Sequence, residues 1–390
     1  MNLGSVARNK VRKNTNMNQK ISGLYKEIFS NAAERKAKGT ELELRVDVDG
    51  VRPLNVISGD IYSNSERTRK YLSSFIFQGV KKIETPTNGI LLIGEKGKFS
   101  LDSDHFTDMQ ITIPPNSHPP KAAFQWKNRS GSVSKCLCKY VSKYFRSVHL
   151  EHDYEVGVVP LEPYETTDLF SPSPHRSQPI SIIDAFAEAG IEIIVVKEKK
   201  DSVIPPKGIP RSVWTDSELH KAMLKHFTLF KDVPQWNVWL LSANEYVMSN
   251  INGITIDRKG KKRGGCAVFQ SATGWKSTEE KRMRLFIYVH ELGHCFNLHH
   301  PWSKLQADPL AETAGHATLS WMNLPWRYYL SEESRGEEAF WEAFDFQFSN
   351  SELMHLRHGF RNDVIFGGNP IDKKIDTKST IKGAEKSATR

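Results

Sequence analysis

The stretch that decides the fold is VHELGHCFNLHH, residues 289–300. Four of these twelve residues are histidines, and two of them, His290 and His294, lie near the end of an apolar run that follows a capping box formed by Ser277 and Glu280. We therefore predict a helix from this box to about residue 296. Histidines four residues apart lie on one face of a helix, about one turn apart, so both imidazoles can reach one metal ion.

The residues around this pair predict the rest of a metal site. Glu291 lies about 100° around the helix from His290, where a carboxylate can reach a water on the metal without being a ligand. A third ligand must come from beyond the helix, and His300 can supply it if the chain turns back at Asn297. His299 is an alternative third ligand. A buried helix whose histidines only make hydrogen bonds is the other interpretation of the motif.

The pattern His290-Glu-x-x-His294-x-x-Asn297-x-x-His300 resembles the signature of the metzincin zinc proteases, HExxHxxGxxH, with Asn in place of Gly. Ser320-Trp321-Met322-Asn323 resembles the Met-turn that these proteases carry beneath the metal. The resemblance covers roughly residues 190–360 and is nearest to the bacterial matrixin-like members. It implies a Zn²⁺ cofactor, with ligands His290, His294 and His300, the general base Glu291, and Met322 as the structural floor of the site.

The resemblance also implies a place for a protein or peptide substrate. In metzincins the strand shortly before the active-site helix is a sheet edge that pairs with substrate. Here that strand would be 266–270, which makes Cys266, Ala267, Val268 and Phe269 candidate substrate-binding residues. The function implied is a zinc-dependent endopeptidase that hydrolyses peptide bonds with a metal-activated water. The alternative is a binding or targeting protein whose metzincin-like domain is a non-catalytic zinc scaffold.

The chain before the motif predicts a second domain. From Glu41 onwards apolar residues alternate with charged ones, as in a half-buried strand, whereas 21–38 is interpreted as an amphipathic helix. We expect an α+β fold: a metzincin-like catalytic domain with a mixed twisted sheet and an active-site helix, preceded by a small β-rich domain. The predicted divisions are a basic leader at 1–40, the β-rich domain at 41–155, the protease domain at 156–365 and a polar basic tail at 366–390.

Composition and charge exclude several classes of protein. The net charge is +9, but residues 1–38 hold nine basic and two acidic residues and 366–390 hold six and three, which leaves the middle near neutrality. A basic nucleic-acid-binding face is therefore not expected. No apolar run is long enough to span a membrane, and no signal peptide is recognisable, so we expect a cytoplasmic protein or export by a leaderless route. Four scattered cysteines exclude a disulfide framework.

Overall fold

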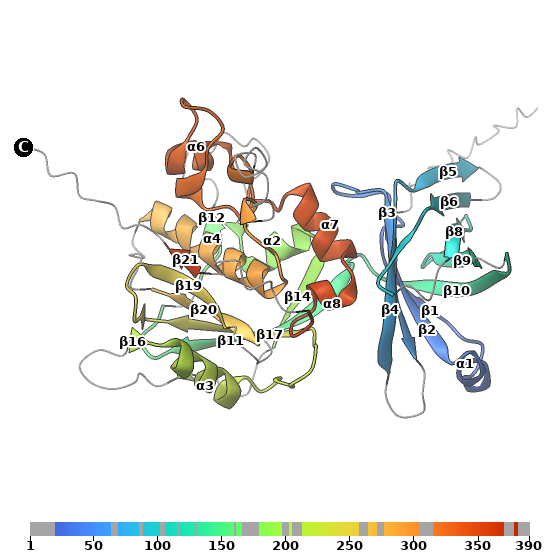
Figure 1. The fold of residues 1–390 in the computed structure, drawn as a ribbon, viewed down its shortest axis with the longest axis horizontal. Coiled ribbons are helices and arrows are strands. Elements are labelled where there is room, and N and C mark those ends of the chain that lie inside the picture. Colours follow the sequence, from blue (N-terminus) through green and yellow to red (C-terminus); the bar gives the residue numbers. More distant parts are fainter. Residues whose placement is uncertain are drawn as a thin grey trace, which may run out of the picture.

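The structure is a computed structural model of the chain. It describes residues 20–63, 69–85, 89–101, 106–115, 117–128, 131–159, 161–165, 179–196, 203–204, 213–256, 264–270, 277–303, 315–369 and 378–380. Two sheets form two halves that lie side by side, with short helices between them (Figure 1). Residues 1–19 of the basic leader and most of the C-terminal tail lie outside the described residues.

The first half is one curled antiparallel sheet of ten strands in the order β5-β6-β8-β9-β10-β1-β2-β3-β4-β7. The strands are β1 (Gly23–Glu27), β2 (Thr40–Asp47), β3 (Val56–Ser63), β4 (Lys70–Gln78), β5 (Lys81–Thr85), β6 (Gly89–Glu95), β7 (Lys98–Phe99), β8 (Phe106–Ile113), β9 (Lys121–Asn128) and β10 (Val133–Ser142). Inward-facing apolar residues of alternating strand positions form its core, and phenylalanines such as Phe75, Phe106 and Phe124 pack ring against ring at its centre.

The second half is a mixed sheet in the order β14-β11-β17-β20-β19-β21. Its strands are β11 (Arg146–Glu155), β14 (Ile191–Val195), β17 (Asn237–Ala243), β19 (Ile251–Ile256), β20 (Gly265–Phe269) and β21 (Lys378–Thr380), with β15 (Val203–Ile204) beside β11. Strands β14, β11, β17 and β20 are mutually parallel, whereas β19 and β21 are antiparallel to their neighbours. Two further pairs are β12 (Tyr164–Glu165) with β13 (Pro179–Ile180) and β16 (Val213–Trp214) with β18 (Glu245–Tyr246).

Helices cover both faces of the second sheet. Helices α2 (Ile182–Glu188) and α4 (Thr278–Cys295) pack on one face, and α3 (Asp216–His226) packs on the other. The chain also forms α6 (Gly336–Ala343), α7 (Asn350–His358), α8 (Arg361–Val364) and a 3₁₀ turn η2 (Pro325–Arg327). Alternate residues of β17 face opposite ways: Val238 and Leu240 pack with α4, and Trp239 and Leu241 pack with α3. This two-layer cover explains why the β17 sequence reads as a continuous apolar run.

The predicted fold class is wrong. Strands account for 41% of the described residues and helices for 25%, and the largest sheet is a ten-stranded curled one rather than a small β-rich domain before a metzincin-like fold. The physical reason is that strands predicted singly join into one sheet through long-range pairing, which local patterns do not encode.

The predicted divisions of the chain also differ from the structure. Strand β1 lies in the segment interpreted as leader and helix, because Gly23, Tyr25 and Glu27 alternate as buried residues. Among residues 20–40, only α1 (Ala32–Lys38) is helical. Strand β11 belongs to the second sheet, so the first one ends at Ser142 rather than near 155. Phe366, placed in the tail, is buried and bridges to Gln235.

Polar contacts of Arg357, which lies on α7, and of Arg52 join the two halves. Arg357 donates to Asp47 Oδ2 at 3.0 Å and to the carbonyl oxygen of Ala189 at 2.9 Å, and both charged side chains are buried. Arg52 extends from the first half to Gln347 Oε1 and to the carbonyl oxygen of Phe348.

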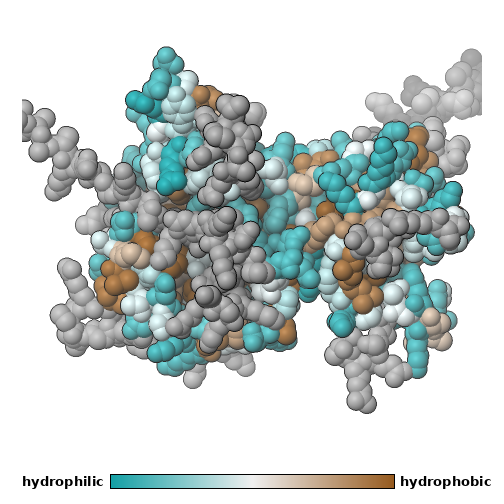
Figure 2. All heavy atoms as spheres, viewed as in Figure 1, coloured by the Kyte–Doolittle hydropathy of each residue, from teal (hydrophilic) through white to brown (hydrophobic). Residues whose placement is uncertain are grey.

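Hydrophilic residues cover most of the described surface visible in Figure 2, where apolar residues form separate small groups. Among the described residues, no helix has the length and apolar character needed to cross a membrane.

One of these junction residues should make stability depend on pH. His358 is fully buried, with Nδ1 2.9 Å from Ser58 Oγ and Nε2 3.1 Å from Asp47 Oδ2. Burial lowers its pKa from 6.5 to about 4, although Asp47 opposes this shift. Between these two pH values the unfolded chain binds the proton and the folded chain does not, so acidification costs stability, by about 3 kcal/mol at most. We expect urea unfolding to show a larger loss between pH 7 and pH 4.5 in the wild type than in His358→Gln, and equal losses would contradict this role.

Candidate metal centre

Helix α4 carries the first part of the site. Ser277 accepts a hydrogen bond from the backbone N–H of Glu280, and the Glu280 carboxylate accepts one from the backbone N–H of Ser277, which confirms the predicted capping box. The helix runs from Thr278 to Cys295, as predicted to within a residue. Its last two turns are completely buried, so the side chains of this segment are held by packing on all sides.

The helix ends in a left-handed turn at Asn297, as the spacing to His300 required. Asn297 has φ 62°, its N–H donates to the carbonyl oxygen of His294 at 2.9 Å, and the N–H of Leu298 donates to that of Gly293 at 3.1 Å. These two bonds form a Schellman motif, which reverses the chain direction after a helix. The Asn297 side chain adds a bond from Nδ2 to the carbonyl oxygen of Asp363 at 2.7 Å. The reversal brings His300 back over α4.

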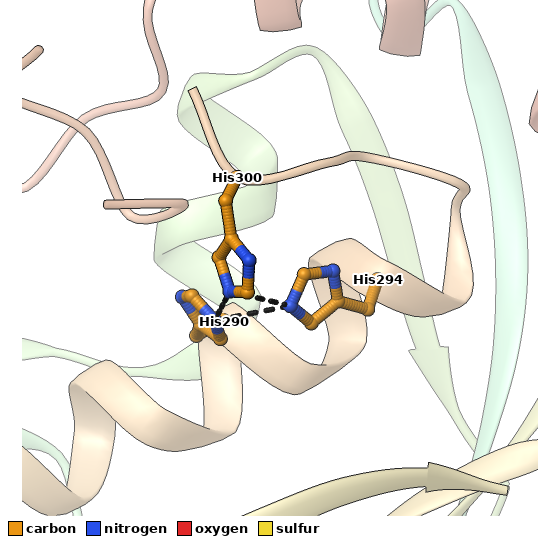
Figure 3. Close-up of side chains that lie close together, drawn as sticks. All are labelled: His290, His294 and His300. Carbon is orange, nitrogen blue, oxygen red and sulfur yellow. Dashed lines mark hydrogen bonds between the residues drawn. The ribbon is translucent and has the colours of Figure 1, made fainter. Parts of the chain in front are cut away.

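Three imidazoles converge where this reversal meets the helix, as Figure 3 shows. The Nε2 atoms of His290, His294 and His300 lie 3.1, 3.2 and 3.3 Å apart. Nitrogens bound to one tetrahedral zinc at about 2.0–2.1 Å lie about 3.3 Å from one another, so the spacing fits a single ion. Among the described residues, His290, His294 and His300 are the one set of at least three candidate ligands close enough together to hold a metal ion.

Hydrogen bonds on the opposite ring nitrogens fix what the Nε2 atoms can do. His290 Nδ1 lies 2.7 Å from the carbonyl oxygen of Trp321, and His294 Nδ1 lies 2.8 Å from that of Leu298. A carbonyl oxygen only accepts, so both Nδ1 atoms carry the proton in the neutral rings and both Nε2 atoms present lone pairs. Two lone pairs facing each other at 3.1 Å repel unless a cation lies between them. The donor set therefore fits a metal ion.

Burial keeps two of these rings, those of His290 and His300, neutral. It lowers the pKa of His290 to about 4, although the hydrogen bond to the Trp321 carbonyl oxygen favours the protonated ring and opposes this shift. Burial and the neighbouring His294 and His290 hold the pKa of His300 well below its usual value. Neutral imidazole is the form that binds metal, so the site is ready for a cation at neutral pH without first losing protons.

An aromatic column that the sequence analysis missed holds His300. Its ring stacks on Trp302 at 4.6 Å with an interplanar angle of 7°, and Trp302 stacks in turn on His316 at 5.1 Å. The Arg327 guanidinium lies 5.1 Å from the centre of the Trp302 ring. The only signal in the sequence is the tryptophan two residues after His300, and nothing local indicates His316 or Arg327.

The predicted Met-turn lies against the ligand helix. Met322 is fully buried, and its sulfur occupies the space where a side chain at Gly293, between the two helical ligands, would stand. The Ser320 hydroxyl accepts from the Met322 N–H at 2.9 Å, and Asn323 Nδ2 donates to the carbonyl oxygen of Thr318 at 2.6 Å. This fixed turn also presents the Trp321 carbonyl to His290, so it orients a ligand as well as packing beneath it.

Glu291 lies under strand β19, which the sequence analysis did not connect with the site. Its carboxylate is fully buried, and Thr255 Oγ1 donates to Oε2 at 3.4 Å. A Cβ on Gly253 would stand 2.4 Å from Glu291 Cγ and 2.7 Å from Oε1, so only glycine lets the strand pass this close. Strand β19 and the glutamate are therefore neighbours.

The predicted substrate edge is wrong in its position. Strand β20, which contains Cys266, Ala267, Val268 and Phe269, pairs with β17 on one side and β19 on the other. An interior strand has no backbone groups left for an added strand, and these four side chains are all buried. Burial and a hydrogen bond with Cys295 raise the pKa of the Cys266 thiol, as expected for an inert packing residue. The strand beyond it, β19, lies at this side of the sheet and pairs only with the short β21 on its outer edge.

Comparison of the chain with protein-family models, with curated proteins and with solved structures gave no match, so its function has to be inferred from this site.

Proposed function

We propose that the protein is a zinc-dependent endopeptidase. The observation that carries this proposal is the convergence of three Nε2 atoms, two of them fixed as lone-pair donors, one residue away from a buried carboxylate. Three imidazoles are a ligand set that suits Zn²⁺ and leaves a fourth position for water or substrate. The likeness of the 290–300 motif to the metzincin signature supports zinc and peptide hydrolysis among the possible metals and reactions.

Each residue then has a distinct task. His290, His294 and His300 would hold the ion, and the carbonyls of Trp321 and Leu298 keep two of these rings in the required tautomer. Zinc supplies Lewis acidity, which polarises a scissile carbonyl and acidifies water. Glu291 accepts the water proton and passes it to the leaving amine. Its burial beneath β19 keeps bulk water away from the carboxylate.

We place the substrate on the outer edge of β19. An extended peptide adds to a sheet edge through main-chain hydrogen bonds, and β19 passes directly over Glu291 at Gly253. The edge already pairs antiparallel with β21, with Gly253 opposite Ser379 and Ile254 opposite Lys378. A scissile bond bound in the same way would lie beside the glutamate and the three histidines.

The test of the proposal combines metal content with cleavage. The purified chain should contain one zinc per molecule, cleave an unstructured protein, lose both on chelation and recover both when zinc is added. His300→Ala should abolish both, because two helical histidines alone hold zinc weakly, whereas replacement of His226, a half-buried histidine on α3, by Ala should change neither. A chain that holds no metal, or that cleaves after complete chelation, would contradict the proposal.

The pairing of β21 with β19 predicts that the C-terminal segment competes with substrate. From the sequence alone, deletion of 1–20 together with 367–390 is expected to leave cleavage largely intact. The structure requires a later cut, because the Asn369 carbonyl oxygen accepts from Asn297. Deletion of 371–390 should instead increase cleavage of an extended peptide severalfold, mainly through a lower KM. Ser379→Pro should do the same by removing a backbone donor, and Ser387→Pro should not. An unchanged KM in the deletion variant would show that β21 does not cover the substrate edge.

A second role for the first half has one observation in its favour. The curled sheet holds a cavity of about 510 Å³ with an aromatic wall of Phe75, Phe106, Phe124 and Trp126, and the Lys38–Glu27 ion pair lies at its side. Such a cavity suits a binding or targeting role, and the zinc site could then be a non-catalytic scaffold. Zinc binding without any cleavage by the wild type would favour this second role.

A further inference from the structure

A second cavity, of about 390 Å³, lies where the first half meets the second. Side chains from β2 and β3 form one side of it, and side chains from β11 and α8 form the other. The charged residues that line it are five basic and two acidic, a net charge of +3 without His149: Lys26, Arg45, Arg69, Arg146 and Arg361 against Glu43 and Asp60. This cavity is separate from the metal centre, and nothing in the proposed peptidase reaction uses it.

The carboxylate of Asp60 already has hydrogen-bond partners within the protein. Asp60 accepts two bonds from Arg45, at 2.6 and 3.0 Å, and one from Ser74 Oγ at 2.7 Å. Arg146 Nη1 lies 3.9 Å from Asp60 Oδ2, beyond hydrogen-bond distance. All three charged side chains are at most 3% exposed, so two guanidinium groups share one buried carboxylate. One buried positive charge is left without a matching anion.

The second carboxylate is shared in the same way. Glu43 lies 3.0 Å from Lys26 Nζ and 3.0 Å from Arg69 Nη2. Neither acid is therefore free to neutralise Arg146 or Arg361. The described residues offer no hydrogen-bond partner to Arg146 Nη1 or to Arg361 Nε, although both atoms are buried. Unpaired N–H donors on buried cations are costly, and they mark a place where an anion would be stabilised.

The guanidinium of Arg146 is held in position for such a ligand. Its Nε donates to the carbonyl oxygen of Leu356 at 2.9 Å, and its Nη2 donates to that of Gly359 at 2.6 Å. These two bonds fix the plane of the guanidinium group and leave Nη1 available to a ligand. Burial, and then Arg45, lower the pKa of Arg146 to about 9. Burial alone would raise the pKa of Asp60, but Arg45 and Arg146 outweigh it and bring that pKa down to about 2. The lowered pKa of Asp60 shows that the cations around this carboxylate outweigh its burial.

We propose that this cavity is a binding site for a phosphate group, free or carried by a small phosphorylated metabolite. A phosphate monoester has a charge near −2 at neutral pH and several acceptor oxygens, which match the net charge and the unpaired guanidinium donors. Phe145 and Trp236 also line the cavity, and their rings offer an apolar surface to the organic part of the ligand. Because β2, β3, β11 and α8 all contribute, a bound phosphate bridges the two halves and stabilises their junction.

The experiment measures binding of inorganic phosphate to the full chain by calorimetry, with sodium chloride at matched ionic strength as the reference. Arg361→Gln and Arg69→Gln should each weaken binding about 10- to 100-fold, the effect of losing a charged hydrogen-bond donor. Arg335→Gln, which removes an exposed guanidinium far from the cavity lining, should bind like wild type. Arg146 is not substituted alone because its bonds to Leu356 and Gly359 support α7.

Glycerol phosphate and acetate separate the sources of the ligand. Tighter binding of glycerol phosphate than of inorganic phosphate indicates a phosphorylated metabolite, and equal binding indicates the free anion, and both support the site. The melting temperature should rise with phosphate in wild type and Arg335→Gln and rise much less in Arg361→Gln. The proposal is overturned if neither phosphate compound binds, if acetate binds as tightly as phosphate, or if Arg361→Gln and Arg69→Gln bind as wild type does.

Discussion

Replacing Glu291 by Gln should lower kcat/KM for an extended peptide by about 10²- to 10⁴-fold and leave the zinc content at one per chain. Glutamine has the same shape as glutamate, so it keeps the packing against Gly253 and the contact with Thr255. It cannot accept the water proton, because an amide oxygen is a very weak base. Metal binding should persist, since the three ligand nitrogens all belong to histidines.

A matched control lies on the same helix. Glu279→Gln removes an exposed carboxylate from the first turn of α4 and should leave cleavage and zinc content unchanged. The readouts are steady-state cleavage, zinc by atomic emission and the melting temperature of each protein. If Glu291→Gln loses zinc, the glutamate is a ligand or a support of the ligands. If it cleaves as fast as wild type, another group is the base and the proposed mechanism fails.

The local parts of the site could be predicted because each depends on residues close in sequence. The capping box at Ser277 correctly predicted where α4 begins. The spacing from His290 to His300 predicted a chain reversal at Asn297, and that residue has the left-handed conformation the reversal needs. These features follow from helix periodicity and terminal hydrogen bonding, which a sequence displays directly.

The sheet order could not be predicted because it depends on which strands pair over long distances. Strands β19 and β20 are both short apolar runs, and nothing in either shows that β20 is interior and β19 lies outside it. The same limit hid the size of the first sheet, whose ten strands come from separate short alternating segments. In the segment before Ala32, the alternate burial of Gly23, Tyr25 and Glu27 was missed because the apolar residues Ile21, Leu24, Tyr25 and Ile28 are also spaced as on one face of a helix.

The second large effect that we expect is a loss of zinc affinity when Asn297 is replaced, because the turn at this residue positions His300. Asn297→Val places a β-branched residue at φ 62°, a conformation that costs such a residue about 1–3 kcal/mol. The substitution also removes the bond from Nδ2 to the Asp363 carbonyl oxygen. The chain should relieve the strain by leaving the left-handed region, which breaks the Schellman bonds of Asn297 and Leu298 and moves His300 away from the other two rings.

Asn297→Gly separates the strain from the lost hydrogen bond. The sequence alone predicts a nearly neutral change, because glycine adopts positive φ freely, but the structure adds the cost of the lost bond to Asp363, about 1 kcal/mol. Zinc affinity, measured by competition with a chromophoric chelator, should therefore fall in the order Asn, Gly, Val, with at least a tenfold loss in Val. A Val variant that binds zinc as tightly as the Gly variant would show that the left-handed turn is not what positions His300, and the third ligand would then have to be sought elsewhere.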